Sequence, residues 1–168
     1  MTDEQKVRDL HERILRQKGY EYVSILGKGG FSVVITVFSP KYQQNFACKI
    51  TELDQYAVEP DMTEVDALRT LDNPHIISLF DHFRIGRFFY VVLQHCENGN
   101  VQDLVRVNGT FPFRVALKYL REVAVALAQC HATGIAHRDI KPSNILIDSY
   151  GRAILADFGL GIKLNENE

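Results

Sequence analysis

The first apolar positions of the chain recur at the spacing of a helix. Between residues 3 and 18 they fall on one side of such a helix, at Val7, Leu10, Ile14 and Leu15, and Gly19 follows as a stop signal. The pattern predicts an amphipathic leading helix within residues 1–19. Accessory packing is its simplest role, because the segment carries no motif of chemistry.

The pattern changes to short apolar runs after Tyr20. Runs at residues 22–26, 32–38 and 46–50 are separated by turn signals, which predicts three strands in an antiparallel meander. A helix is expected to open near Asp61 and to stop at Asn73-Pro74, since proline cannot continue it. Two further strands are predicted at residues 78–83 and 87–94.

Helical periodicity returns in the second half of the chain. Apolar residues follow i, i+3, i+4 spacing from Ala116 to His131, between Pro112 and Gly134, which predicts a helix over residues 116–133. Residues 145–148 and 152–156 then indicate a final hairpin. The composition changes near residues 97–100, so the boundary between a β-rich half and a helical half is expected there.

Composition and charge narrow the class of protein. With 168 residues, 46% hydrophobic and 24% charged, the chain is typical of one soluble domain. A net charge of −2 gives no pull toward nucleic acid or anionic membranes. The longest apolar runs, Phe88–Leu93 and Val123–Ala128, are far shorter than the roughly 18 residues that span a bilayer. Three cysteines without a CxxC pair favour a reducing, cytoplasmic setting.

A glycine-rich segment, Gly27-Lys-Gly-Gly-Phe-Ser-Val-Val34, lies between two predicted strands. Glycines let backbone N–H groups approach phosphate oxygens without a Cβ in the way. No helix follows, which disfavours a dinucleotide-binding fingerprint, and the G-K-[ST] of a Walker loop is missing. A tight turn without a ligand is the alternative.

Lys49 lies between apolar neighbours on the third predicted strand. A lone strand lysine usually faces solvent, but strand alternation would place a hydrophobic residue at this position. If Lys49 points inward, it needs an anion, either a phosphate or a carboxylate. Glu64, in the first turn of the helix that follows, is one candidate, although an acid there is also favoured by the helix dipole alone.

The segment His137-Arg-Asp-Ile-Lys-Pro-Ser-Asn144, followed by Asp157-Phe-Gly159, carries the strongest signal. Asp139, Asn144 and Asp157 flank a predicted hairpin that would bring them together. Asn144 and Asp157 offer hard oxygen ligands that suit Mg²⁺, Asp139 is a candidate acceptor of a hydroxyl proton, and Lys141 beside it is suited to stabilise charge. At about one in twenty per position, the whole set arises by chance with a probability on the order of 10⁻¹⁰.

In these motifs and their order, the sequence resembles the eukaryotic protein kinases from about Tyr20 to its end. Lys141 in its motif resembles the serine/threonine branch. The resemblance implies an α+β fold with a complete small antiparallel β-sheet lobe plus one helix, and the start of a mainly helical second lobe. It also implies domain limits after the leading helix 1–19: an N-lobe at 20–93, a hinge at 94–100 and a partial C-lobe at 101–168.

The same resemblance implies roles for individual residues. Asp139 would be the catalytic base with Lys141 beside it, and Lys49 would hold the ATP phosphates and pair with Glu64. Asn144 and Asp157 would bind Mg²⁺. The remaining residues implied to contact ATP are those of the glycine-rich loop, the adenine pocket and the hinge, namely Gly27, Lys28, Gly29, Gly30, Val34, Ala47, Leu93, Gln94, Cys96 and Leu146.

The expected activity is phosphoryl transfer from Mg·ATP to a serine or threonine hydroxyl of a protein substrate. Kinases continue past Asp-Phe-Gly through an activation segment and further helices, whereas this sequence stops at Glu168. The chain is therefore expected to be a fragment with little transfer to peptides on its own, and a partner is expected to cover the apolar face of the helix at 116–133. The alternative is a non-catalytic, kinase-like nucleotide-binding or interaction module.

Overall fold

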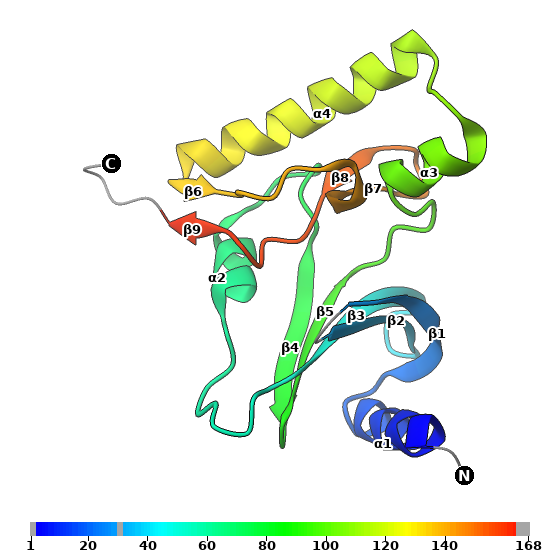
Figure 1. Ribbon diagram of the computed structural model, residues 1–168, viewed down its shortest axis with the longest axis vertical. Helices are drawn as coiled ribbons and strands as arrows, with labels where there is room; N and C mark the ends of the chain where they lie inside the picture. The colour runs from blue at the N-terminus through cyan, green and yellow to red at the C-terminus, as the bar shows by residue number, and fades with distance from the viewer. Residues whose placement is uncertain (1–2, 30–31, 164–168) are drawn as a thin grey trace. The chain divides into compact units, whose positions relative to one another are not determined.

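The computed structural model describes residues 3–29 and 32–163, which form two compact units. The first unit comprises residues 1–60 and 80–95, and the second comprises residues 61–79 and 96–168. A five-stranded antiparallel sheet lies in the first, and helices dominate the second (Figure 1). The predicted fold class, a β-sheet lobe followed by the start of a helical lobe, is confirmed.

The sheet of the first unit has the strand order β1-β2-β3-β5-β4. Its strands are β1 (Glu21–Lys28), β2 (Ser32–Ser39), β3 (Gln44–Glu52), β4 (Leu79–Ile85) and β5 (Phe88–Gln94). β1, β2 and β3 pair in sequence as the predicted antiparallel meander, and β3 then pairs with β5. β-branched residues fill β2 and favour this extended, half-buried conformation.

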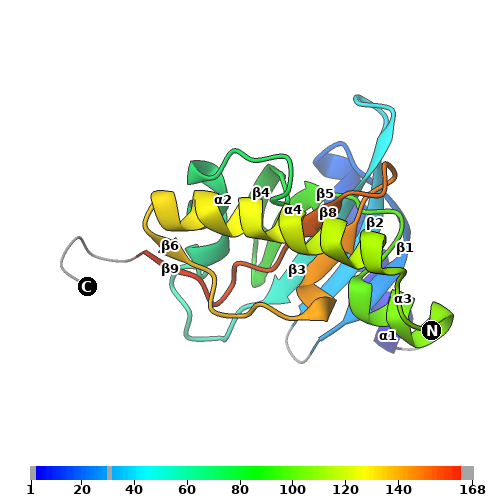
Figure 2. The same cartoon turned by 90° about the horizontal axis from the view of Figure 1, so that it is seen from above.

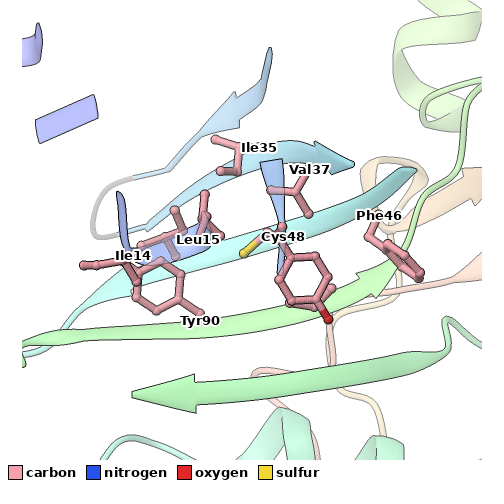
Figure 3. Packing of buried hydrophobic residues seen from close by; sticks show 10 residues of the cluster. Ile14, Leu15, Ile35, Val37, Phe46, Cys48 and Tyr90 are labelled. Carbon is pink, nitrogen blue, oxygen red and sulfur yellow. The ribbon is translucent and has the colours of Figure 1, made fainter. Parts of the chain in front are cut away.

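The leading helix α1 (Asp3–Gln17) packs on one face of this sheet. Ile14 and Leu15 insert among residues of β2, β3 and β5, which include Cys48 (Figure 3). His11 is also buried, and its Nδ1 lies 2.7 Å from the hydroxyl of Tyr90 on β5. α1 ends before Gly19, whose φ of 84° is accessible to glycine at little cost. The predicted leading helix is confirmed as α1, and Ile14 and Leu15 of its apolar stripe belong to the core, whereas Leu10 is exposed.

In the second unit, α4 (Phe113–Ala132) runs along β8 (Ala153–Leu155) and β6 (Ile135–Ala136), as Figures 1 and 2 show. β8 forms the predicted hairpin with β7 (Ile145–Ile147), and β6 pairs with β9 (Ile162–Lys163). The unit also contains α2 (Thr63–Thr70), which precedes Asn73-Pro74 as predicted, and the 3₁₀ turn η1 (Pro142–Asn144).

Helix α3 (Val101–Asn108) was not predicted from the sequence pattern. The Asn100 side chain caps it by accepting a hydrogen bond from the Asp103 N–H at 2.8 Å, and Gly109 ends it with φ at 79°. Periodicity missed α3 because its eight residues give too few turns for a pattern and none is buried. In the described ranges, no helix has the length and apolar character needed to cross a membrane.

Candidate active site

One face of the five-stranded sheet carries four of the predicted nucleotide-site residues. Val34 lies directly opposite Lys49 in the β2–β3 ladder, and Ala47 lies opposite Leu93 in the β3–β5 ladder. Residues that face each other across a ladder, and residues two apart on a strand, share one side of a sheet. These four residues therefore share a face, and it is the opposite of the face on which Cys48 contacts α1.

The described residues of the glycine-rich segment lie at the end of β1 and the start of β2. Gly27 and Lys28 pair with β2, and the N–H of Gly29 donates to the carbonyl of Ser32 at 2.7 Å. A Cβ on Gly29 would lie 3.2 Å from Ser32 Oγ, so the Ser32 side chain would have to shift by a few tenths of an ångström to accept one. Gly30 lies outside the described residues.

Asp139 and its two polar partners form the centre of the candidate site in the second unit. Lys141 Nζ donates to Asp139 Oδ2 at 2.8 Å, and Asn144 Nδ2 donates to the same oxygen and to the Asp139 carbonyl, both at 2.9 Å. The hydrogen bond from Lys141, assisted by that from Asn144, lowers the pKa of Asp139, and the same bond raises the pKa of Lys141. The carboxylate is thus ionised at neutral pH and fixed in direction.

His137 holds the backbone of Asp139 through a hydrogen bond, a role that the sequence motif alone did not reveal. Its Nδ1 accepts a hydrogen bond from the Asp139 N–H at 3.2 Å, and its Nε2 lies 2.9 Å from the carbonyl oxygen of Ala156. The ring also contacts Phe158 edge to face, with centroids 4.6 Å apart. Since His137 and Phe158 are both buried, the imidazole joins the Asp139 backbone to the segment around Asp157.

Asn144 and Asp157 flank the β7–β8 hairpin at the same end. Asn144 precedes β7, and the N–H of Ala156, just after β8, donates to the Asn144 carbonyl at 2.9 Å. Asp157 adopts a left-handed φ of 62°, which costs energy for a residue other than glycine and is held here by the fixed neighbours Ala156 and Phe158.

The donor chemistry at this end of the hairpin fits Mg²⁺. Because Asn144 uses its amide nitrogen toward Asp139, its amide oxygen is the atom left for a cation. Within the described ranges, no three His, Cys, Asp or Glu side chains gather as metal ligands. A cation that takes one or two protein oxygens and completes its shell with water and phosphate matches that donor set, and Mg²⁺ binds in this way.

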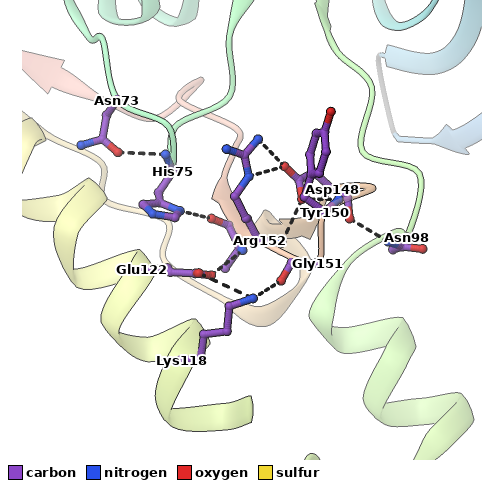
Figure 4. A network of polar contacts seen from close by, with 10 residues as sticks. Asn73, His75, Asn98, Lys118, Glu122, Asp148, Tyr150, Gly151 and Arg152 are labelled. Atoms are coloured by element: carbon purple, nitrogen blue, oxygen red, sulfur yellow. Dashed lines mark hydrogen bonds and ion pairs between the residues drawn. The ribbon is translucent and has the colours of Figure 1, made fainter. Parts of the chain in front are cut away.

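A polar network fixes the tip of the same hairpin (Figure 4). Arg152 Nε donates to the buried carboxylate of Asp148 at 2.8 Å, and the N–H of Ala153 donates to Glu122 on α4 at 2.7 Å. Lys118, one turn earlier on α4, donates to the Gly151 carbonyl at 2.5 Å. These hydrogen bonds attach the tip of the hairpin to α4. They thereby limit the movement of the hairpin that carries Asn144 and Asp157 at its other end.

The predicted hinge residues fall where the two units meet in sequence. Gln94 ends β5 in the first unit, whereas Cys96 begins the second of the two stretches that form the second unit. Burial raises the pKa of the Cys96 thiol to about 12, so it is neutral at physiological pH. Leu146 on β7 forms a bridge with Asn100, which ties the segment after the hinge to the hairpin.

Lys49 and Glu64, the predicted ion pair, belong to different units. Lys49 is half-buried on β3, and Glu64 is buried in the first turn of α2. Their pairing stays a prediction, as does the joint contact of Val34, Ala47 and Leu146 with one ligand.

The hydrogen bond from Lys141 predicts a measurable change in the titration of Asp139. We expect Lys141→Met to raise the pKa of the Asp139 carboxyl, because the main group that favours its ionised form is removed. The pH of half-protonation in a carbon-13 carboxyl NMR titration should therefore move upward. Arg106→Met, which removes a cation from Asp103 on α3, is the matched control and should leave the Asp139 curve in place. An unchanged curve in Lys141→Met would contradict this assignment.

Stability should follow the same titration. A carboxyl with a lowered pKa in the folded state stabilises the fold above its unfolded-state pKa, and this contribution is lost as the pH falls through the folded value. Lys141→Met should therefore flatten the acid limb of a stability profile near and below pH about 4, where aspartates titrate.

Comparison with known proteins agrees with this geometry. A sequence profile of the protein kinase domain matches residues 20–168. The chain is 34% identical over 150 residues to 3-phosphoinositide-dependent protein kinase B of Dictyostelium discoideum, covering 87% of this chain and 16% of that protein. It is 32% identical over 165 residues to human Rho-associated protein kinase 1, covering 96% of this chain and 12% of that protein.

A third relative is cytokinesis protein sepH of Aspergillus niger, 30% identical over 161 residues, or 94% of this chain and 12% of that protein. The chain thus spans between 12% and 16% of the length of these curated relatives. Because the profile covers nearly all of the chain and the catalytic motifs lie within it, the chain belongs to the eukaryotic protein kinase family, in its serine/threonine branch.

Proposed function

We propose that this chain binds Mg·ATP and supplies the residues for phosphoryl transfer to a serine or threonine hydroxyl. The observation that carries the proposal is the fixed, ionised Asp139 carboxylate between Lys141 and Asn144. A base held in one direction can orient an acceptor hydroxyl and take its proton as the oxygen attacks phosphorus. Lys141, within 2.8 Å of that carboxylate, would stabilise negative charge on the transferred group.

Nucleotide binding would use residues from several elements of the chain. Lys49 would contact the α- and β-phosphates, and the turn at Gly27–Gly29 would cover them with backbone N–H groups. Val34, Ala47, Leu93 and Leu146 would enclose the adenine, with Gln94 and Cys96 beside it. Asn144 and Asp157 would hold Mg²⁺, which when bound supplies charge neutralisation on the phosphate oxygens. The three cysteines are free thiols, which supports a cytoplasmic location.

A titration with Mg·ATP, followed by amide NMR of the 168-residue chain, tests this proposal. We expect shifts at Gly27 and Gly29, and Mg²⁺-dependent shifts at Asn144 and Asp157. Transfer of radiolabelled phosphate to a serine or threonine peptide is measured in parallel for the wild-type chain and for Asp139→Asn. Transfer that is lost in Asp139→Asn but kept in Asp103→Asn would support catalysis, and the absence of Mg·ATP binding would overturn the proposal.

The exposed apolar face of α4 favours a second function, that of a nucleotide-binding interaction module. Phe113 and Leu120 are 79% and 68% exposed, and Leu117 lies between them on the same side of the helix. Such a face suits a protein partner. Mg·ATP binding without any Asp139-dependent transfer would support this alternative.

A further inference from the structure

The first unit contains a cavity on the sheet face that carries α1, away from the face with Lys49. It has a volume of about 720 Å³, within the roughly 300–1,000 Å³ of small-molecule sites. Its lining comes from four separate parts of this unit, namely α1, the facing ends of β1 and β2, the end of β3 with the residues after it, and the start of β5 with the residue before it.

The floor of the cavity borders the buried cluster that contains Ile14, Leu15 and Ile50, and Val33 and Phe88 are its partly buried edge. Val33 and Ile50 face each other in the β2–β3 ladder and continue the apolar surface beyond Cys48. Phe88 on β5 closes the floor, and His11 forms the wall toward α1, with its ring 4.7 Å from that of Phe88. This part of the site suits a bulky apolar group.

The rim carries charges of both signs close together. Arg87 forms an ion pair with Glu52, and its guanidinium has further N–H donors. Asp54 follows Glu52 on the same wall, and its Oδ1 accepts the Tyr56 N–H at 2.8 Å. The N–H of Leu53 donates to the Arg87 carbonyl at 2.7 Å, so the acidic and basic parts of the rim are joined through the backbone.

We propose that this cavity binds an amino-acid zwitterion with a large apolar side chain, either free or as a dipeptide. The ligand carboxylate would lie on Arg87, its ammonium group on Asp54, and its side chain on the partly buried Val33 and Phe88. A rim with charges of both signs over an apolar floor matches all three parts of such a molecule, because each charge of the ligand then meets an opposite charge. The site does not depend on nucleotide binding or on phosphoryl transfer.

The test uses L-tryptophan and L-leucyl-L-tryptophan as probes, with amide NMR of the whole 168-residue chain. We expect saturable shifts at Gly29, Ser32 and Val33, which line the cavity. N-acetyl-L-tryptophan lacks the ammonium and L-tryptophan amide lacks the carboxylate, and each should bind at least tenfold more weakly. The tighter of the two parent probes identifies the source of the ligand as a free amino acid or a peptide.

Asp54→Asn is the discriminating variant. Its amide keeps an oxygen for the Tyr56 N–H but loses the charge, so we expect tenfold weaker tryptophan binding without loss of folding. Asp103→Asn, with the same change on α3 of the other unit, should bind as the wild type does. Val33→Phe should abolish binding by filling the floor. Absence of shifts up to about 10 mM of either probe, or equal binding by wild type and Asp54→Asn, would overturn the proposal.

Discussion

Replacing Phe158 by alanine should lower the free energy of unfolding of the second unit by about 3–5 kcal/mol. The Phe158 ring is 0% exposed and contacts His137 edge to face, so its removal leaves a cavity that rigid neighbours cannot fill. His137 in turn holds the Asp139 N–H and the Ala156 carbonyl. Loss of the ring should therefore loosen the very segment that carries the candidate catalytic carboxylate.

Urea denaturation followed by circular dichroism, together with hydrogen exchange of amides in residues 96–163, measures this loss. Phe113→Ala is the matched control, because it makes the same chemical change at a ring that is 79% exposed. It should alter stability by no more than about 0.5 kcal/mol. Equal losses in the two variants would show that burial at Phe158 does not stabilise the unit.

The strands and long helices could be predicted from the sequence because their apolar residues lie mainly on one face, which is the face that packs in the core. Alternation in β2 and β3 places Ile35 and Cys48 against α1 and leaves Val34 and Lys49 on the other face. α4 has 20 residues, which is enough turns for the helical spacing of its apolar residues to be recognised. By contrast, α3 is short and depends on the cap at Asn100, and the two-residue strands β6 and β9 depend on pairing between distant segments.

The candidate site was predictable as a set of residues but only partly as an arrangement. Sequence spacing suggested that the hairpin brings Asn144 and Asp157 together, and the N–H of Ala156, the residue before Asp157, donates to the Asn144 carbonyl. The role of His137 in holding the Asp139 backbone could not be predicted from the sequence. It depends on two ring nitrogens that each form a hydrogen bond with a different backbone segment. The role of Glu122 could not be predicted either, because its carboxylate accepts a hydrogen bond from the N–H of Ala153, 31 positions away in sequence.

Lys49→Met should remove most of the stabilisation that Mg·ATP gives to the chain. At a nucleotide concentration of 100 times Kd, a ligand specific for the folded state adds about 2.7 kcal/mol, which corresponds to a rise in Tm of roughly 5–10 °C for a chain of this size. Hydrogen bonds to a charged group contribute about 1.5–3 kcal/mol. Without the ammonium, the same concentration should therefore add only about 0.3–1.3 kcal/mol.

Lys41→Met is the matched control for this variant, since Lys41 is an exposed lysine in the β2–β3 turn of the same unit. Its rise in Tm with Mg·ATP should equal that of the wild type. Circular dichroism without nucleotide shows whether each variant folds, which separates weak binding from a failure to fold. Val34 and Lys49 share a sheet face, so a normal rise in Tm in Lys49→Met would mean that this face does not contact the phosphates and that the proposed nucleotide site is misplaced.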